Sequence, residues 1–290
     1  MKKILLIITL MLSFSTLSFA NNNVEKTYYE NGKLECEYPL KNNIKHGLAK
    51  CYYENGFLWE EIPYNNGKEN GILKLYTTTG KLSKTSQYKN GIKEGIEKSY
   101  LTDTGVVWQE TPYINGKIDG IKKAYHGDGS LWQEIPYKND QRAGIEKWYH
   151  ENGNIQLTRT YKNNKLEGIE KTYYKNGNIE VIKHYQNGKL EGIEEMYYQS
   201  GVLKQTATYK NGNRDGISKN YLENGALKQE TSYKNGKRDG VMIIYNSNGS
   251  LWSTIQYQNG MPISGKCSGG KKWTNAQLNN WNKGLSVSCD

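Results

Sequence analysis

Histidine and the carboxylates are the residue types of this chain that could bind a metal or catalyse proton transfer. The four histidines are His46, His126, His150 and His184. His126 and His150 are 24 residues apart, which on the sheet inferred below is two strands, or about 9.6 Å. Zinc–nitrogen bonds are about 2.1 Å long, so one metal ion cannot bridge this pair without another set of ligands. We therefore expect no metal site and no cofactor.

The glutamates recur at fixed positions and do not form one distinctive pair. One column contains Glu97, Glu146, Glu170 and Glu194, and a second contains Glu37, Glu61, Glu110, Glu134 and Glu230. A catalytic carboxylate needs a particular environment, whereas such repetition is typical of a solvated, charge-balanced sheet face. The sequence also lacks GxSxG, HExxH and Walker-type loops. We therefore expect no enzymatic activity.

Lysines form a further column, which Glu195 interrupts. Its members are Lys50, Lys74, Lys98, Lys123, Lys147, Lys171 and Lys219. Ammonium groups beside tyrosines could bind anionic polymers, or the lysine stems could cover the tyrosine rings and keep the sheet soluble. Loss of Lys2 and Lys3 with the leader described below lowers the net charge from +10 to +8, which favours the second interpretation. We expect no nucleic-acid partner, because the chain is expected to be exported.

Tryptophans are the most site-like residues of the sequence. Trp59, Trp108, Trp132 and Trp252 share one repeat position. The indoles could pack across their opposite neighbours, which the register below predicts to be Cys51, Ser99, Ala124 and Ile244. Alternatively, an exposed stripe of Trp59, Trp108 and Trp132 could bind a glycan chain or an extended peptide.

The first twenty residues, MKKILLIITLMLSFSTLSFA, have the basic start, apolar stretch and small-x-small end of an export signal. We expect cleavage after Ala20 and a mature chain in the periplasm, on the cell surface or secreted, without a transmembrane segment. Disulfides are the default outside the cytoplasm. Cys267 and Cys289 flank the C-terminal segment and are expected to pair. Cys36 and Cys51 could also pair, but the predicted register places them on opposite faces, so that bond stays open.

All these residues are positioned by a repeat of 24 residues. One series of tyrosines is Tyr28, Tyr52, Tyr76, Tyr100, Tyr125, Tyr149, Tyr173, Tyr197, Tyr221 and Tyr245, with one extra residue near Thr104. A second series is Tyr64, Tyr88, Tyr113, Tyr137, Tyr161, Tyr185, Tyr209, Tyr233 and Tyr257. Segments of about seven residues alternate with turns that contain Asn-Gly, which predicts successive β-hairpins.

Three-residue loops with a bulge at both turns of each repeat give one register. In it Tyr174 faces Asn178, Tyr185 faces Lys189 and Val181 faces Ile193. Both tyrosine columns then share a face with two aliphatic columns, represented by Ile169 and Ile179. The predicted fold is all-β, an elongated single-layer antiparallel sheet of about ten hairpin repeats over residues 21–265, on the order of 95 Å long.

Residues 266–290 break the repeat and are expected to cap the last hairpin. A short helix is predicted over residues 274–283, with Thr274 or Asn275 as its N-cap and Gly284 after its end. Trp273 and Trp281 would then pack on the final strands.

The repeats resemble the bacterial variant of the MORN repeat. The likeness rests on Y-x-N-G-x-x-x-G followed by an aliphatic residue, as in residues 88–96 and 233–241, and on residues 44–47 of the first copy. It covers about residues 24–265 and implies an elongated binding or scaffolding module. Bacterial relatives are often labelled YwqK-type antitoxin components.

We therefore predict an exported, non-enzymatic repeat scaffold that mediates protein–protein interaction at the bacterial envelope or with a host. One alternative is a cell-wall or glycan-binding module that uses Trp59, Trp108 and Trp132. Another is an antitoxin or immunity component. Exposed end strands could also pair edge to edge and give a dimer.

Overall fold

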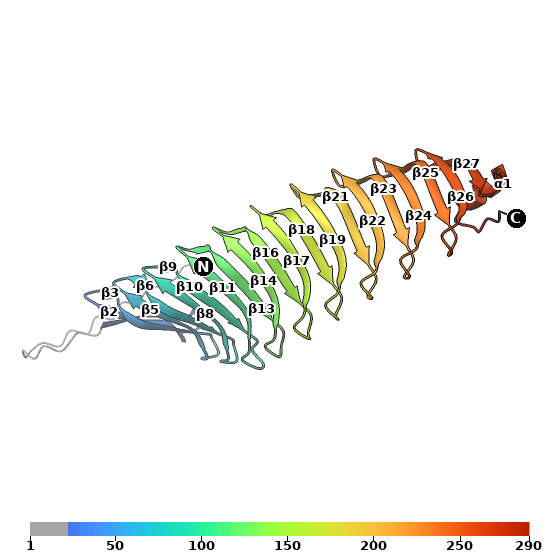
Figure 1. Ribbon diagram of the computed structural model, residues 1–290. Coiled ribbons are helices and arrows are strands. Elements are labelled where there is room, and N and C mark those ends of the chain that lie inside the picture. The colour runs from blue at the N-terminus through green and yellow to red at the C-terminus, as the bar shows by residue number, and fades with distance from the viewer. Residues whose placement is uncertain (1–22, 290) are drawn as a thin grey trace, which may run out of the picture. The chain divides into compact units, whose positions relative to one another are not determined.

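The computed structural model describes residues 23–289. The chain divides into two compact units, with the boundary between Gln141 and Arg142. Within each unit, antiparallel hairpins follow one another in a single layer (Figure 1). The predicted fold class, an all-β single-layer antiparallel sheet of tandem hairpins, is confirmed in each unit. The expected export signal, residues 1–20, lies outside the described residues.

The first unit contains β1 (Asn23–Tyr28), β2 (Leu34–Lys41), β3 (Ile44–Lys45), β4 (Gly47–Tyr52), β5 (Leu58–Asn65), β6 (Lys68–Glu69), β7 (Gly71–Tyr76), β8 (Leu82–Lys89), β9 (Ile92–Lys93), β10 (Gly95–Tyr100), β11 (Val107–Ile114), β12 (Lys117–Ile118), β13 (Gly120–Tyr125) and β14 (Leu131–Lys138). The short strand β15 (Gln141–Arg142) contains the boundary.

The second unit contains β16 (Gly144–Tyr149), β17 (Ile155–Lys162), β18 (Lys165–Tyr173), β19 (Ile179–Gln186), β20 (Lys189–Leu190), β21 (Gly192–Tyr197), β22 (Leu203–Lys210), β23 (Asn213–Tyr221), β24 (Leu227–Lys234), β25 (Lys237–Tyr245), β26 (Leu251–Gln258), β27 (Met261–Cys267) and the helix α1 (Asn275–Asn282).

Two kinds of turn alternate along the chain. At the first kind, the Tyr174 N–H donates to the Asn178 carbonyl at 2.9 Å, so the predicted three-residue loop is confirmed there. At the second kind, Gln186 pairs with Lys189, and the two residues between them both have positive φ, 51° at Asn187 and 80° at Gly188. This is a two-residue turn of the Asn-Gly type, so the three-residue loop predicted at this position is wrong.

A β-bulge in each repeat also corrects the predicted register. Tyr173 pairs with Ile179 as expected, but Thr172 pairs with Val181, which leaves Glu180 as the extra residue of a bulge. Val181 pairs with Met196 and not with Ile193. A one-residue slip moves every later side chain to the opposite face. The two tyrosine columns therefore lie on opposite faces, and the prediction that they share one is wrong.

The two faces of the sheet differ in burial, and we name them accordingly. The buried face carries Ala49, Ile62 and Leu73, against which Tyr38, Tyr64 and Tyr88 pack. The exposed face carries one aliphatic residue in each repeat, between 42% and 56% exposed: Leu48, Ile72, Ile96, Ile121, Ile145, Ile169, Ile193, Ile217 and Val241. The structure thus separates the aliphatic column represented by Ile169 from the tyrosine column represented by Tyr185.

Side-chain hydrogen bonds at several of the three-residue turns join one repeat to the next. The hydroxyl of the second tyrosine of a Tyr-Tyr pair donates to a main-chain carbonyl of the following repeat. Tyr53 donates to the Tyr76 carbonyl at 2.7 Å, and Tyr174 donates to the Tyr197 carbonyl at 2.7 Å. His150 occupies the same repeat position, and its Nε2 lies 3.0 Å from the Tyr173 carbonyl oxygen. This histidine therefore has a structural contact in place of the tyrosine hydroxyl.

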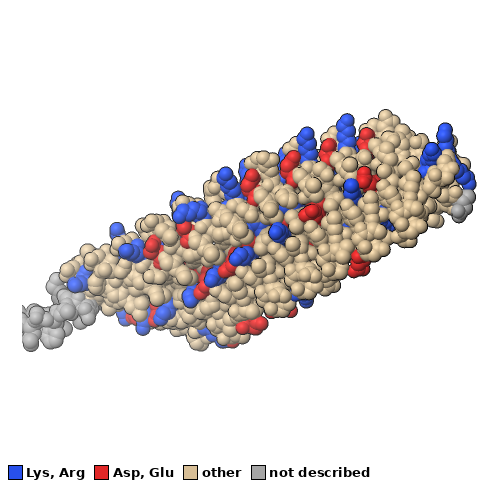
Figure 2. All heavy atoms as spheres, viewed as in Figure 1, with Lys and Arg blue, Asp and Glu red and all other residues tan. Residues whose placement is uncertain are grey.

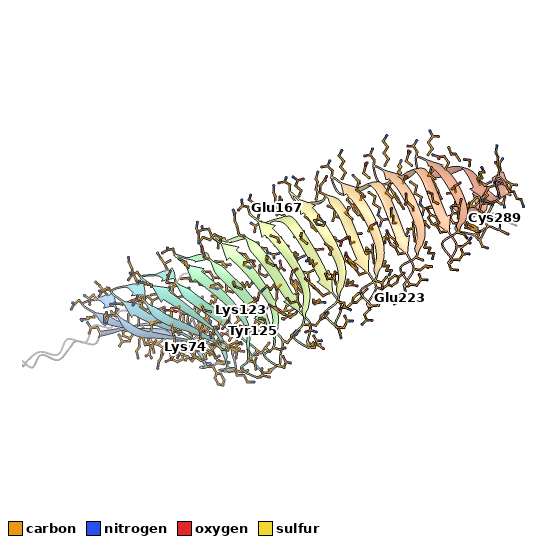
Figure 3. The ribbon with its side chains drawn as sticks, viewed as in Figure 1. Lys74, Lys123, Tyr125, Glu167, Glu223 and Cys289 are labelled. Atoms are coloured by element: carbon orange, nitrogen blue, oxygen red, sulfur yellow. A yellow bond between two sulfur atoms is a disulfide. The ribbon has the colours of Figure 1, made fainter. Side chains whose placement is uncertain are left out.

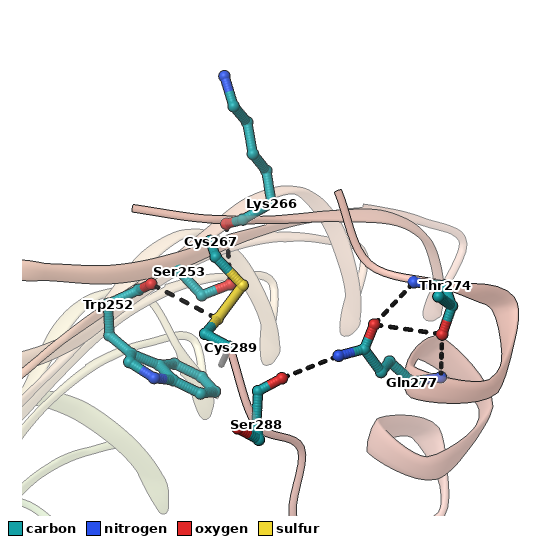
Figure 4. The surroundings of a disulfide bond; sticks show 8 residues. All are labelled: Trp252, Ser253, Lys266, Cys267, Thr274, Gln277, Ser288 and Cys289. Atoms are coloured by element: carbon teal, nitrogen blue, oxygen red, sulfur yellow. Dashed lines mark hydrogen bonds between the residues drawn. A yellow bond between two sulfur atoms is a disulfide. The ribbon is translucent and has the colours of Figure 1, made fainter. Parts of the chain in front are cut away.

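The C-terminal segment packs on β26 and β27. The predicted helix is α1, with Thr274 as its N-cap in a capping box with Gln277. Cys267 and Cys289, the pair expected from the sequence, are joined by a disulfide beside Trp252 (Figure 4). The Gln277 amide donates to the Ser288 carbonyl at 2.8 Å, which holds the chain end against the helix.

Candidate binding surfaces

The four tryptophans of the shared repeat position occupy the extra residue of the bulge. Cys51 pairs with Glu60 and Tyr52 with Leu58, which leaves Trp59 between them. The same skip occurs at Trp108, Trp132 and Trp252. The predicted opposite neighbours, Cys51, Ser99, Ala124 and Ile244, are therefore wrong by one residue, because the predicted register has its bulge in the loop and none at this strand position.

Three of these tryptophans are exposed and the fourth belongs to the C-terminal cap. Trp59, Trp108 and Trp132 are 37–40% exposed. Trp59 and Trp132 each have an aromatic neighbour. The Trp59 ring centroid is 6.0 Å from that of Tyr53, and the Trp132 ring centroid is 6.2 Å from that of His126. Trp252 lies 6.0 Å from Trp273 and 6.3 Å from Trp281. Trp252 thus packs in the cap, while the other three leave part of their indole surface open.

Lysine, glutamate and tyrosine side chains form small clusters on the exposed face. The Lys74 ammonium lies 3.1 Å from the Glu61 carboxylate, and the Tyr76 hydroxyl donates to the same carboxylate at 3.0 Å. Burial alone would raise the pKa of Glu61, but these two hydrogen bonds hold it below its ordinary value. Figure 3 labels Lys74, Lys123 and Tyr125, which lie on this face of the sheet.

A second cluster of the same kind surrounds Glu110. Its carboxylate accepts from the Tyr125 hydroxyl at 2.9 Å and lies 3.1 Å from the Lys98 ammonium. Burial, together with the hydrogen bond to Glu110, raises the pKa of Tyr125 to about 12. The carboxylates of this column therefore balance lysine charge on the exposed face, as the sequence predicts for these glutamates.

A shallow depression lies between neighbouring repeats of the exposed face in the first unit. It has a volume of about 460 Å³ and is lined by Ile72, Lys74, Thr85, Gln87, Gly95, Ile96, Lys98 and Tyr100. Its floor combines aliphatic side chains with lysine stems. Such a surface suits contact with a partner that offers apolar groups and carboxylates.

The other glutamate column lies on the buried face, and its predicted solvation is wrong. Glu97, Glu146, Glu170 and Glu194 are at most 9% exposed. Glu146, Arg159, Glu170 and Lys183 form consecutive cross-strand pairs of alternating charge on β16–β19, here called the charge ladder. The Glu146 carboxylate is fully buried and lies 3.1 Å from Arg159 and 3.6 Å from Arg142. Pairing of opposite charges explains how a single-layer sheet buries carboxylates.

Cations stacked on tyrosine rings also cover the buried face. The Lys45 ammonium is 3.4 Å from the Tyr38 ring centroid. The Arg214 guanidinium lies between two rings, 5.8 Å from Tyr209 and 5.6 Å from Tyr233. These stacks were not predicted, although the 24-residue spacing of Arg214 and Arg238 is visible in the sequence. The cations complete the packing of this face and leave the tyrosines little open surface.

Two of the histidines, His150 and His184, and all four cysteines have structural partners. The His184 Nδ1 lies 2.9 Å from the Ile193 carbonyl oxygen, and residues 23–289 contain no group of three or more side chains placed to hold a metal. Cys36 and Cys51 lie directly opposite each other on β2 and β4 and form a second disulfide. The predicted register put them on opposite faces. That prediction is wrong because the turn between β2 and β3 has two residues and not three. Two disulfides fit an oxidising compartment.

Comparison with known proteins identifies the repeat. The model of the MORN repeat variant family matches residues 21–42, 45–66, 69–90, 118–139, 142–163, 166–187, 190–211, 214–235 and 238–259. The repeat that contains the extra residue lies between the third and fourth matches. A search of curated proteins found no match.

Two solved structures illustrate the remaining likeness. TcdB2-TccC3-TEV is 13% identical over 81% of this chain and 14% of that chain, with a TM-score of 0.18. TcdB2-TccC3 without its hypervariable C-terminal region is 12% identical over 84% of this chain and 16% of that chain, with a TM-score of 0.19. This chain spans about a sixth of their length, and scores this low carry no argument about it.

Proposed function

The chain belongs to the MORN repeat variant family, and we propose that it is a non-enzymatic scaffold that binds a protein partner through its exposed face. Repeats of this family generally serve as scaffolds for protein or membrane interaction. The proposal rests on the aliphatic column, whose members are about half exposed in nine repeats. Exposed apolar surface bordered by polar groups is typical of a protein-interaction site.

The composition of the exposed face favours a protein partner. In seven of the nine strands the exposed aliphatic residue is followed two positions later by lysine. Glutamates of neighbouring strands form ion pairs with some of these lysines. The Ile72–Lys74–Tyr76 series repeats as Ile96–Lys98–Tyr100 about 9.6 Å further on, two strands away. Apolar centres surrounded by polar groups are the usual anatomy of a protein interface. An extended or repetitive partner would meet the same contacts in successive repeats.

The proposed place of action is outside the cytoplasm, at the bacterial envelope or against a host. The two disulfides support an oxidising compartment, and residues 1–20 have the pattern of an export signal. The one described helix, α1, has eight residues, and residues 23–289 contain no helix with the length and apolarity of a membrane span.

The test compares isoleucines of equal exposure at two locations. Ile72, Ile96 and Ile121 lie on the exposed face, and threonine at all three positions should abolish capture of specific proteins from envelope or host extracts. The matched control replaces Ile44, Ile92 and Ile114, which are 48–50% exposed but lie at or beside two-residue turns. Capture that both triple variants retain, or recovery of polysaccharide alone, would refute a protein-binding exposed face.

Wall-glycan binding is the second candidate, and the exposure of Trp59, Trp108 and Trp132 favours it. Indole rings stack on apolar faces of sugars, and these three are open at their bulges. Alanine at all three positions should abolish sedimentation with purified wall material. Phe57→Ala, at a residue that is 50% exposed, is the control for general loss of aromatic surface. Unchanged sedimentation of the triple variant would remove this candidate.

A further inference from the structure

Lysines gather at the two-residue turns of the second unit. The lysine edge consists of Lys162, Lys165, Lys189, Lys210, Lys234 and Lys237, all of them exposed. They flank the Asn-Gly or Asn-Asn residues at which β17 turns into β18, β19 into β20, β22 into β23 and β24 into β25. Figure 2 shows lysine and arginine side chains projecting along this margin of the hairpins, with acidic groups lying lower between them. The exposed face and the tryptophans lie elsewhere on the repeat, so this surface is separate from the proposed protein-binding one.

The placement of these lysines is unfavourable for folding. Lys162 lies directly opposite Lys165 across the turn, and Lys234 lies directly opposite Lys237. Like charges in directly opposed positions destabilise a strand pair. None of the six lysines forms an ion pair within residues 142–289. No ion pair of this region offsets the repulsion between the opposed ammonium groups. An anion bound from outside would offset it.

The acidic residues of the same edge are directed toward the backbone. Glu167 accepts a hydrogen bond from the Asn187 N–H at 2.7 Å. Asp239 accepts one from the Asn259 N–H at 3.0 Å. Glu191 and Asp215 make the same contact with the turns that follow them. All four are half-buried. The carboxylates are thus held at the base of the turns, while the ammonium groups extend into solvent.

The arrangement is a line of positive charge about one turn wide. Turns of successive repeats are two strands, or about 9.6 Å, apart, so four turns cover about 29 Å. Between the lysines, the tips of these turns carry only asparagine and glycine. A membrane-binding edge would need apolar side chains that insert between lipids. Such side chains occur at the turns of the first unit, where Ile44 and Ile92 are exposed, but not at these four tips.

We propose that the lysine edge binds a linear polyanion, a flexible chain that carries phosphate or carboxylate groups at regular intervals. Each turn neutralises one or two anionic groups, and the polymer runs along the edge across successive repeats. Binding releases counterions from the polymer, so the affinity depends steeply on salt.

The test uses the full chain with long-chain inorganic polyphosphate and poly-L-glutamate as probes. Glutamine replaces all six lysines of the edge in one variant. The control variant replaces six exposed lysines located elsewhere, Lys81, Lys175, Lys204, Lys228, Lys272 and Lys283, and therefore has the same net charge. Six contacts predict a slope of log K against log salt of about −4, so raising salt from about 50 to 200 mM should weaken binding roughly 300-fold.

The outcomes separate local binding from general charge. Binding of either polymer by the wild type and by the control, with at least about a tenfold loss in the edge variant, supports the proposal. Equal losses in the two variants, or no binding at about 50 mM salt, overturn it. Binding to vesicles of phosphatidylglycerol and phosphatidylcholine without binding to either polymer also overturns it and indicates a membrane surface. Unchanged circular dichroism of both variants excludes misfolding as the cause of a loss.

Discussion

Glu146 is the residue of the charge ladder whose replacement should matter most. Its carboxylate is 0% exposed and receives hydrogen bonds from the Arg159 guanidinium at 3.1 and 3.3 Å and from the Trp148 indole. Burial alone would lower the pKa of Arg159, but the hydrogen bonds to Glu146 raise it above its ordinary value. Glu146→Gln keeps the size of the side chain and removes the charge. The guanidinium then loses its main anionic partner inside the sheet.

The expected cost follows from the surroundings of Arg159. Removal of one partner of a buried ion pair costs about 3–5 kcal/mol. The Arg159 side chain is 24% exposed and keeps Glu170 as its neighbour across β17 and β18. Water and Glu170 therefore recover part of the loss. We expect Glu146→Gln to reduce the free energy of unfolding of this region by about 2–3 kcal/mol.

Amide hydrogen exchange of β16–β18 is the appropriate assay, because repeat arrays unfold in parts and a single global transition is not assured. Glu230→Gln in the same unit is the control. Its partner Lys219 is 3.2 Å away, with the two side chains 25% and 39% exposed, and the loss should be only about 0.2–1 kcal/mol. The control is measured at β23 and β24, which contain Lys219 and Glu230. If the two variants lose equal protection around their own sites, burial does not strengthen the charge ladder.

Three further predictions concern other parts of the chain. Burial would raise the pKa of Glu97, but hydrogen bonds from Lys93 and Ser86 hold it below its ordinary value of 4.5. The ionised carboxylate therefore stabilises the fold above pH 4.5, and this stabilisation is lost as the pH falls through the lower pKa of the folded state. Urea unfolding of Glu97→Gln should depend less on pH in that range than unfolding of the wild type. A Cβ at Gly265 would lie 2.5 Å from Trp273, so Gly265→Ala should destabilise the cap by about 1–3 kcal/mol in tryptophan-fluorescence unfolding, whereas Gly269→Ala, with nothing within 4 Å, should not. Cys289→Ser opens a link between residues 22 positions apart and should cost the cap about 3 kcal/mol; an unchanged melting temperature would contradict its role as a clamp.

Periodicity made the hairpins predictable, because every 24 residues the same tyrosines, aliphatics and Asn-Gly turns recur. The three-residue turn at Tyr174 and the pairing of Tyr173 with Ile179 followed from that pattern. The bulge at Glu180 did not, since nothing in its side chain distinguishes an extra residue from a paired one. The Asn-Gly pair at residues 187–188 is also compatible with loops of either two or three residues.

A single-layer sheet makes such a slip hard to detect. In a two-layer protein, a one-residue error in the predicted register would place aliphatic residues in solvent, and the error would be recognised from that. Here both faces carry a tyrosine column, so either register looks reasonable. The cysteines held the missing information. Cys36 and Cys51 share a face only if the turn between β2 and β3 has two residues, and a further register shift of two residues, between the Leu40–Lys45 and Glu37–Lys50 pairs, places them opposite each other. Requiring a disulfide between these two cysteines would have selected the correct register.

The distribution of burial explains how the sheet folds while its exposed face stays uncovered. With no second layer, the sheet buries one face by pairing its own charges, as in the charge ladder, and by stacking cations such as Arg214 on tyrosines. Those contacts supply the cohesion that a hydrophobic core supplies elsewhere. Ile72 and Ile96, which are 56% and 48% exposed, take no part in those charge and cation contacts. Aliphatic residues recur at this position in nine repeats, and the proposed protein-binding face would use them as its apolar contacts.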